Sequence, residues 1–149
     1  MTLENLLGTG QLKEHSAEPA ETQKLLEAAE RNLRDSRFTE ISPETRFDAA
    51  YKAIMQAALA ALMANGYRTS TSQGGHHMTM LQTLPTTIGL SRERMLVLDV
   101  LRRKRNLSDY TGADVDSSSA ENCALEGQKL LQDVTTWLKA NRPDLLVKE

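Results

Sequence analysis

Apolar residues recur at helical spacing along most of the chain, and polar residues between them mark where helices begin and end. The scarcity of β-branched runs and an aromatic content of 4% favour helix over sheet, so we expect an all-α protein. Between the helices, segments without this period are predicted to be connectors, loops or turns, and they cover residues 14–18, 67–77 and 112–119. The predicted helices cover residues 2–7, Pro19 to near Ser36, Pro43 to just before Gly66, 78–84, Ser91 into the basic run at 102–105, and Ser118 or Ser119 to just before Pro143.

The helix that begins at Pro43 is predicted to form the core of the fold. Ser42 supplies a hydroxyl cap, Pro43 suits the first helical position, and Glu44 faces the positive end of the helix dipole. Its apolar stripe is wide, and its many alanines should let neighbouring helices approach closely. The stripe consists of Phe47, Tyr51, Ile54, Met55, Ala58, Leu59 and Leu62.

Length and composition limit the class of protein. A chain of 149 residues suits one domain, here 1–149 with an N-terminal extension at 1–18 and a C-terminal tail at 143–149. A net charge of −2 argues against a dedicated nonspecific DNA-binding protein. The single cysteine, Cys123, excludes an intramolecular disulfide, and we expect it to be a small core residue on a helix. The chain shows neither a signal peptide nor an apolar run long enough for a membrane span, so we expect a cytoplasmic protein that does not bind membranes.

Four adjacent cations, Arg102 to Arg105, end an otherwise apolar helical pattern. One interpretation is a basic last turn that complements the helix dipole. The other is a polar site, because Arg102, Arg103 and Arg105 cannot share one helix face and at least one should lean inward. In that site Arg105 would hold a phosphate, Asn106 would orient it, and Tyr110 would close the site with its phenol.

Two further groups could carry chemistry. The run 74–77 places two glycines before His76 and His77, either of which is explained by capping or loop anchoring. Adjacent histidines could also bind a metal, but no cysteine or acidic cluster accompanies them, so we expect no metal. At the start of the long helix, Arg46 is expected to be a surface or partner-facing cation and Tyr51 a core residue with a tethered hydroxyl. The chain has no phosphate loop, dinucleotide fingerprint, nucleophile elbow or zinc-ligand spacing, and we expect no cofactor.

The order and spacing of four segments resemble the HEPN domain superfamily, the higher-eukaryote and prokaryote nucleotide-binding domains. The resemblance covers roughly residues 20–140. It implies an up-and-down helical bundle of four to five main helices with short extra helices. The segments are Arg46 to Tyr51, Asn65 to Arg68, Gly75 to His77, and Arg102 to Tyr110.

The resemblance also implies a function. Such proteins are usually homodimers in which the Arg-Asn sites of two protomers face one another across a shared cleft. Many are metal-independent ribonucleases of toxin–antitoxin and phage-defence systems, often encoded beside a small nucleotidyltransferase. For this chain the resemblance therefore implies a nucleotide or RNA ligand, a homodimer, and a cognate nucleotidyltransferase or antitoxin as partner.

The family signature is an arginine, a polar residue and, a few residues later, a histidine. This chain keeps Arg105 and Asn106 but has Tyr110 at the histidine position, and a phenol with a reference pKa of about 10 does not titrate near neutrality. Three interpretations stay open: a noncatalytic nucleotide- or RNA-binding protein, an active ribonuclease that uses Arg105 with His76 or His77, and a structural helical bundle. The expected catalytic set is Arg105, Asn106, Tyr110 and His77, and the expected nucleotide-binding set is Arg102, Arg105, Asn106, Tyr110, Arg46, Tyr51 and His76.

Overall fold

Helix α3 lies at the centre of the computed structural model, which describes residues 2–72 and 74–147. Four long helices, α2, α3, α6 and α7, dominate the described residues, and the sheet has only two strands of three residues each. This confirms the predicted all-α helical bundle. In chain order the elements are α1 (Leu3–Gly8), β1 (Leu12–Glu14), α2 (Pro19–Asp35), α3 (Pro43–Ala64), β2 (Tyr67–Thr69), α4 (His76–Gln82), α5 (Leu84–Thr87), α6 (Arg92–Thr111), α7 (Ser117–Asn141) and the 3₁₀ helix η1 (Pro143–Leu146).

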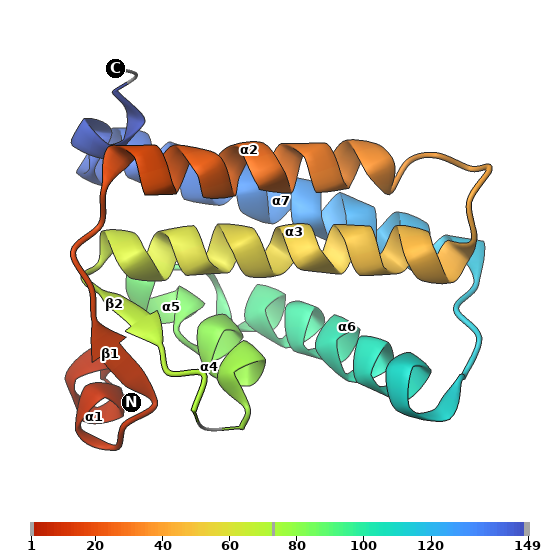
Figure 1. The fold of residues 1–149 in the computed structure, drawn as a ribbon, viewed down its shortest axis with the longest axis horizontal. Coiled ribbons are helices and arrows are strands. Elements are labelled where there is room, and N and C mark those ends of the chain that lie inside the picture. The colour runs from red at the N-terminus through yellow and green to blue at the C-terminus, as the bar shows by residue number, and fades with distance from the viewer. Residues whose placement is uncertain (1, 73, 148–149) are drawn as a thin grey trace.

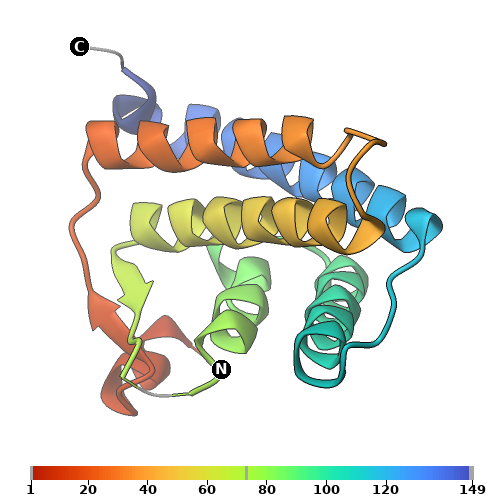
Figure 2. The same cartoon turned by 45° about the vertical axis from the view of Figure 1, so that its right-hand side comes forward.

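The elements form layers above and below α3. Figure 1 shows α2 and α7 running along one side of α3, and α4, α5 and α6 lying on the other side. Figure 2 shows the same arrangement turned, with α4 and α6 both beneath α3. Helix α3 therefore contacts α2, α4, α5, α6 and α7, and a residue on its lower side can reach both α4 and α6.

This central position explains why α3 is buried around nearly its whole circumference instead of along one stripe. Its alanines are almost without exception inaccessible, and Ala50, Ile54 and Leu62 are 0% exposed. Helices pack closely at Gly127, because a Cβ there would lie 2.9 Å from Leu33 Cδ2 and 3.4 Å from the Ala50 carbonyl oxygen. Buried Cys123 lies on α7, as expected.

Helix starts follow the expected caps at two places and depart at a third. Ser42 Oγ accepts a hydrogen bond from the backbone N–H of Thr45, and Ser91 caps α6 in the same way. The expectation that Ser118 or Ser119 caps the last helix is wrong. Asp116 Oδ1 instead accepts from the Ser119 N–H at 2.8 Å, and a carboxylate at this position also faces the positive end of the helix dipole.

The sequence pattern misses the two short strands. β1 and β2 pair antiparallel, with Leu12 opposite Thr69 and Glu14 opposite Tyr67. Strands of three residues are too short for a period-two pattern to be recognised. The predicted loop at 67–77 therefore begins as a strand, and its last two residues, His76 and His77, already belong to helix α4.

Candidate functional site

Three helices bring a tyrosine, a histidine and an arginine to one cavity of about 300 Å³. Tyr51 comes from α3, His77 from α4 and Arg105 from α6. Helices α4 and α6 contact each other, and both contact α3 (Figure 2). His77 and Arg105 lie 26 and 54 positions after Tyr51 in the sequence, so only this packing of the helices brings the three residues together.

Tyr51 and His77 form a hydrogen-bonded aromatic pair. The Tyr51 hydroxyl lies 3.1 Å from His77 Nδ1, and the two rings are tilted by 53° with centroids 5.7 Å apart. Tyr51 is 3% exposed, and burial raises the pKa of its phenol to about 12, against the opposing effect of Arg105. Its hydroxyl therefore keeps its proton at neutral pH. The tethered core tyrosine expected from the sequence is present.

Burial lowers the pKa of His77 below its ordinary value, and the nearby positive charges act in the same direction. His76 contributes to this effect, since its ring lies edge-on to His77 with centroids 4.6 Å apart, followed by Arg105 and Arg102. His77 is therefore neutral at pH 7. His76 itself does not line the cavity.

Arg105 lies over the ring of Tyr51, with its Cζ atom 5.3 Å from the ring centroid. Its Nε atom lies 2.9 Å from Asp109 Oδ2, in an ion pair between residues one helical turn apart. In the part of the chain that the structure describes, no hydrogen bond is made by the two Nη groups of Arg105. These groups are the donors that a bidentate oxyanion requires.

The other three cations of the basic run have different partners. Asp99, which is 7% exposed, accepts from Arg102 Nε at 2.8 Å and pairs with Arg103 Nη2 at 3.1 Å. Lys104 donates to Ser119 Oγ at the start of α7. The sequence interpretation passed over Asp99, although its spacing of three and four residues from the arginines is the usual signal of a helical ion pair. Arg102 is thus held by Asp99 and does not line the cavity.

Asn106 and Tyr110 also lie outside the cavity lining. Tyr110 is 87% exposed, so within a single chain its phenol does not close this cavity. Five residues along an α-helix correspond to a rotation of about 140°, which places Tyr110 away from the side on which Arg105 meets Tyr51.

Arg46 requires a second correction. It was expected at the surface and in the nucleotide-binding set, but it is 5% exposed and its Nε donates to the Ser36 carbonyl oxygen at 2.8 Å. A buried guanidinium needs such a partner, and here it ties the end of α2 to the start of α3. Arg46 is a structural residue.

Sequence reasoning missed three residues that line the cavity: Asp48, Lys52 and Met55. Burial raises the pKa of the Asp48 carboxyl, Asp109 adds to the effect, and Arg105 opposes it. A signal was available, because residues 48, 51, 52 and 55 share one face of a helix at spacings of three and four.

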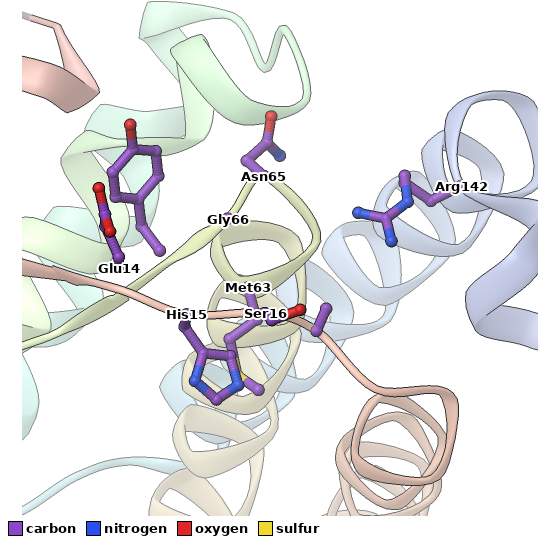
Figure 3. A pocket seen from close by; sticks show the side chains of 9 residues that line it. Glu14, His15, Ser16, Met63, Asn65, Gly66 and Arg142 are labelled. Atoms are coloured by element: carbon purple, nitrogen blue, oxygen red, sulfur yellow. The ribbon is translucent and has the colours of Figure 1, made fainter.

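A larger cavity, of about 530 Å³, lies at the C-terminal end of α3, between the end of β1, the start of β2 and Arg142 (Figure 3). Its most conspicuous cation, Arg142, points toward the end of α3 and donates from Nη1 to the Ala64 carbonyl oxygen at 2.7 Å. Arg142 also binds Asp144 through two hydrogen bonds. Because these contacts cap α3 and use the guanidinium, this cavity does not compete with the Arg105 cavity as the expected site.

Among the described residues, none of the helices is both long and apolar enough to cross a membrane, and no group of three or more His, Cys, Asp or Glu side chains could hold a metal ion. Comparison with known proteins adds no relative: no family model matches the chain, and no curated protein matches it either.

Proposed function

We propose that this protein is a HEPN-type domain that binds the phosphate group of an RNA or nucleotide in the Arg105 cavity, within a toxin–antitoxin or defence-type system. The observation that supports this is that Arg105, the arginine of the sequence motif, lines the same cavity as His77 and Tyr51. A guanidinium with free Nη groups, beside a neutral imidazole and a protonated phenol, suits an oxyanion better than an apolar ligand.

The charges of the cavity are consistent with a ligand of low negative charge. Arg105 and Lys52 are cations on its wall, whereas Asp48 lies on the same wall and Asp109 pairs with Arg105. The near balance of these four charges favours a singly charged phosphate over a polyphosphate.

A metal-independent ribonuclease is the second candidate. It is favoured by the presence of His77 in the cavity, since the histidine of the family signature is replaced by Tyr110 and any acid or base must come from another helix. The reaction would use Arg105 to stabilise the phosphate and His77 to transfer a proton, without a metal.

We also propose a homodimer formed through the outer face of α6. Leu96, Val100 and Leu107 are 47%, 59% and 57% exposed, and their spacing of four and seven residues puts them on one side of the helix. Figure 2 shows α6 at the edge of the bundle, where it packs on α3, α4 and α5, while Arg94 and Lys104 join it to α7 by polar contacts. A cognate nucleotidyltransferase or antitoxin remains a proposed partner, supported by the sequence resemblance.

The experiment is a titration of the protein with a short single-stranded RNA of mixed sequence in buffer that contains EDTA. Fluorescence anisotropy reports binding, and a denaturing gel of the same samples reports cleavage. Binding without cleavage supports the noncatalytic function, and cleavage in EDTA supports the ribonuclease. If the protein neither binds nor cleaves RNA and binds no mononucleotide, the proposed function is wrong and the structural bundle remains.

A further inference from the structure

We propose that Tyr51 is a positioning residue that holds His77 in the tautomer with its proton on Nε2, so that the imidazole offers the cavity a hydrogen-bond donor instead of a base. The inference about ligand binding rests on the proposed function. The tautomer itself is a property of the free protein and can be measured without a ligand.

The buried hydroxyl of Tyr51 requires a hydrogen-bond partner. Tyr51 is 3% exposed, and within the described residues its only hydrogen-bond partner is His77 Nδ1, at 3.1 Å. If the phenol donates to an unprotonated Nδ1, its single proton is satisfied. If Nδ1 carried the proton and donated to the phenol oxygen, the Tyr51 proton would be buried without an acceptor, which is the more costly state.

The relative acid–base strengths of the phenol and the imidazole favour the same direction of the hydrogen bond. An imidazole nitrogen takes up a proton with a reference pKa of about 6.5, so it is a good acceptor, whereas a phenol is a good donor with a reference pKa of about 10. The bond from the Tyr51 O–H to Nδ1 is therefore the stronger of the two directions. The lowered pKa of His77 agrees with this, since it keeps the imidazole neutral and able to accept.

Helix α4, which carries His77, has no carboxylate that could reverse the direction of the hydrogen bond between Tyr51 and His77. The charged and titratable groups near it are His76 on α4, Tyr51, Asp48 and Lys52 on α3, and Arg102 and Arg105 on α6. The acid among them, Asp48, lies beside two cations of the same cavity.

A neutral imidazole with its proton on Nε2 is a poor base, because the remaining lone pair on Nδ1 is already bonded to Tyr51. It is a good donor to an oxyanion. The Arg105 cavity then combines guanidinium, ammonium and imidazole N–H donors, which favours holding a phosphate over removing a proton from a ribose hydroxyl.

Nitrogen-15 NMR of the histidine side chains tests the tautomer. The chain has three histidines, so the variants His76→Gln and His77→Gln assign the signals. We expect the Nδ1 signal of His77 to have the shift of an unprotonated, hydrogen-bonded nitrogen and Nε2 to carry the proton as a single tautomer. Tyr51→Phe should move the Nδ1 signal further toward that of a free unprotonated nitrogen, whereas Tyr67→Phe, which removes a hydroxyl far from this cavity, should not.

The wild-type spectrum alone decides the direction of the bond, so the test does not depend on the folding of Tyr51→Phe. A protonated Nδ1 in wild-type protein overturns the proposal. A folded Tyr51→Phe variant with an unchanged Nδ1 signal overturns it too.

The functional part is tested by two replacements of His77. Glutamine places an amide N–H near the position of Nε2 but cannot act as a base, so His77→Gln should bind the short RNA within about threefold of wild type. Phenylalanine keeps the ring without a donor, so His77→Phe should lose about tenfold or more. Equal losses in both variants would overturn the donor role. If wild-type protein binds no RNA while the NMR result stands, the proposed function fails and the tautomer assignment remains.

Discussion

The substitution Arg105→Ala separates a phosphate-binding arginine from a merely basic surface. In the free protein Arg105 makes a helical ion pair with Asp109 at 2.9 Å and a cation–π contact with Tyr51 at 5.3 Å. Contacts of these two kinds contribute about 0.3–0.5 and about 0.5–1 kcal/mol. The sum is small against a typical unfolding free energy of about 5–15 kcal/mol, so the variant should fold.

The expected loss of affinity is larger than this loss of stability. Removing a hydrogen bond to a charged ligand costs about 1.5–3 kcal/mol, which is about tenfold to a hundredfold in the dissociation constant. Arg103→Ala is the matched control, because it removes the same charge from the same basic run, two positions before Arg105. The Arg103 side chain is 72% exposed and bonded to Asp99, so its removal should cost much less and mainly reduce the salt dependence.

Both variants are titrated by fluorescence anisotropy with the same short RNA at fixed salt, after circular dichroism and mass measurements show unchanged helicity and assembly. Equal losses for Arg105→Ala and Arg103→Ala would mean that the basic run acts only as an electrostatic patch. If Arg105→Ala unfolds and the wild type binds neither RNA nor nucleotide, Arg105 is structural and the reasoning is refuted.

Three other properties can be measured. Gly127→Ala should destabilise the protein by about 1–2 kcal/mol in urea unfolding, because overpacking against Leu33 at 2.9 Å outweighs a gain of about 1 kcal/mol in helix propensity; a more stable variant would show that Leu33 yields freely. Light scattering at micromolar concentration should give a dimer for wild type and a monomer for Val100→Glu, with Leu125→Glu on α7 as the exposed control; a monomeric wild type contradicts the α6 interface. Because the folded pKa of His77 lies below its unfolded value of about 6.5, the unfolded chain binds more protons there and stability should fall as pH drops below about 6.5. His77→Gln should weaken this pH dependence, and an unchanged profile would argue against the lowered pKa.

Much of the fold was predictable because the signals for helices, such as N-caps and apolar periodicity, lie within a few positions of one another in the sequence. The hydroxyls of Ser42 and Ser91 are followed directly by helical apolar patterns, and both cap the helices that the structure contains. Local signals failed where they were too short or too similar. Strands of three residues have no recognisable period, and three consecutive serines after Asp116 obscured which side chain begins α7.

The same difference between local and non-local interactions applies to the residues of the candidate site. The sequence identified Arg105, His77 and Tyr51, but it could not state that they share a cavity, because they lie on three helices whose packing is non-local. It also assigned Arg46 to the surface and Tyr110 to the site. Whether a cation at a helix start is buried depends on the chain that passes over it, and here the end of α2 places the Ser36 carbonyl oxygen there.

By itself, the sequence determined the helical class, the places where most helices begin and end, and the residue types available for chemistry, since these depend on interactions within a few positions of the chain. Only the tertiary structure decided which of the four adjacent cations lines a cavity. Successive residues of a helix point about 100° apart, so Arg102 and Arg103 meet Asp99, Lys104 meets α7, and Arg105 alone of the run lies over Tyr51. That choice follows from the rotation of α6 against α3 and α4, which is set by the packing of buried residues such as Leu98 and Leu101.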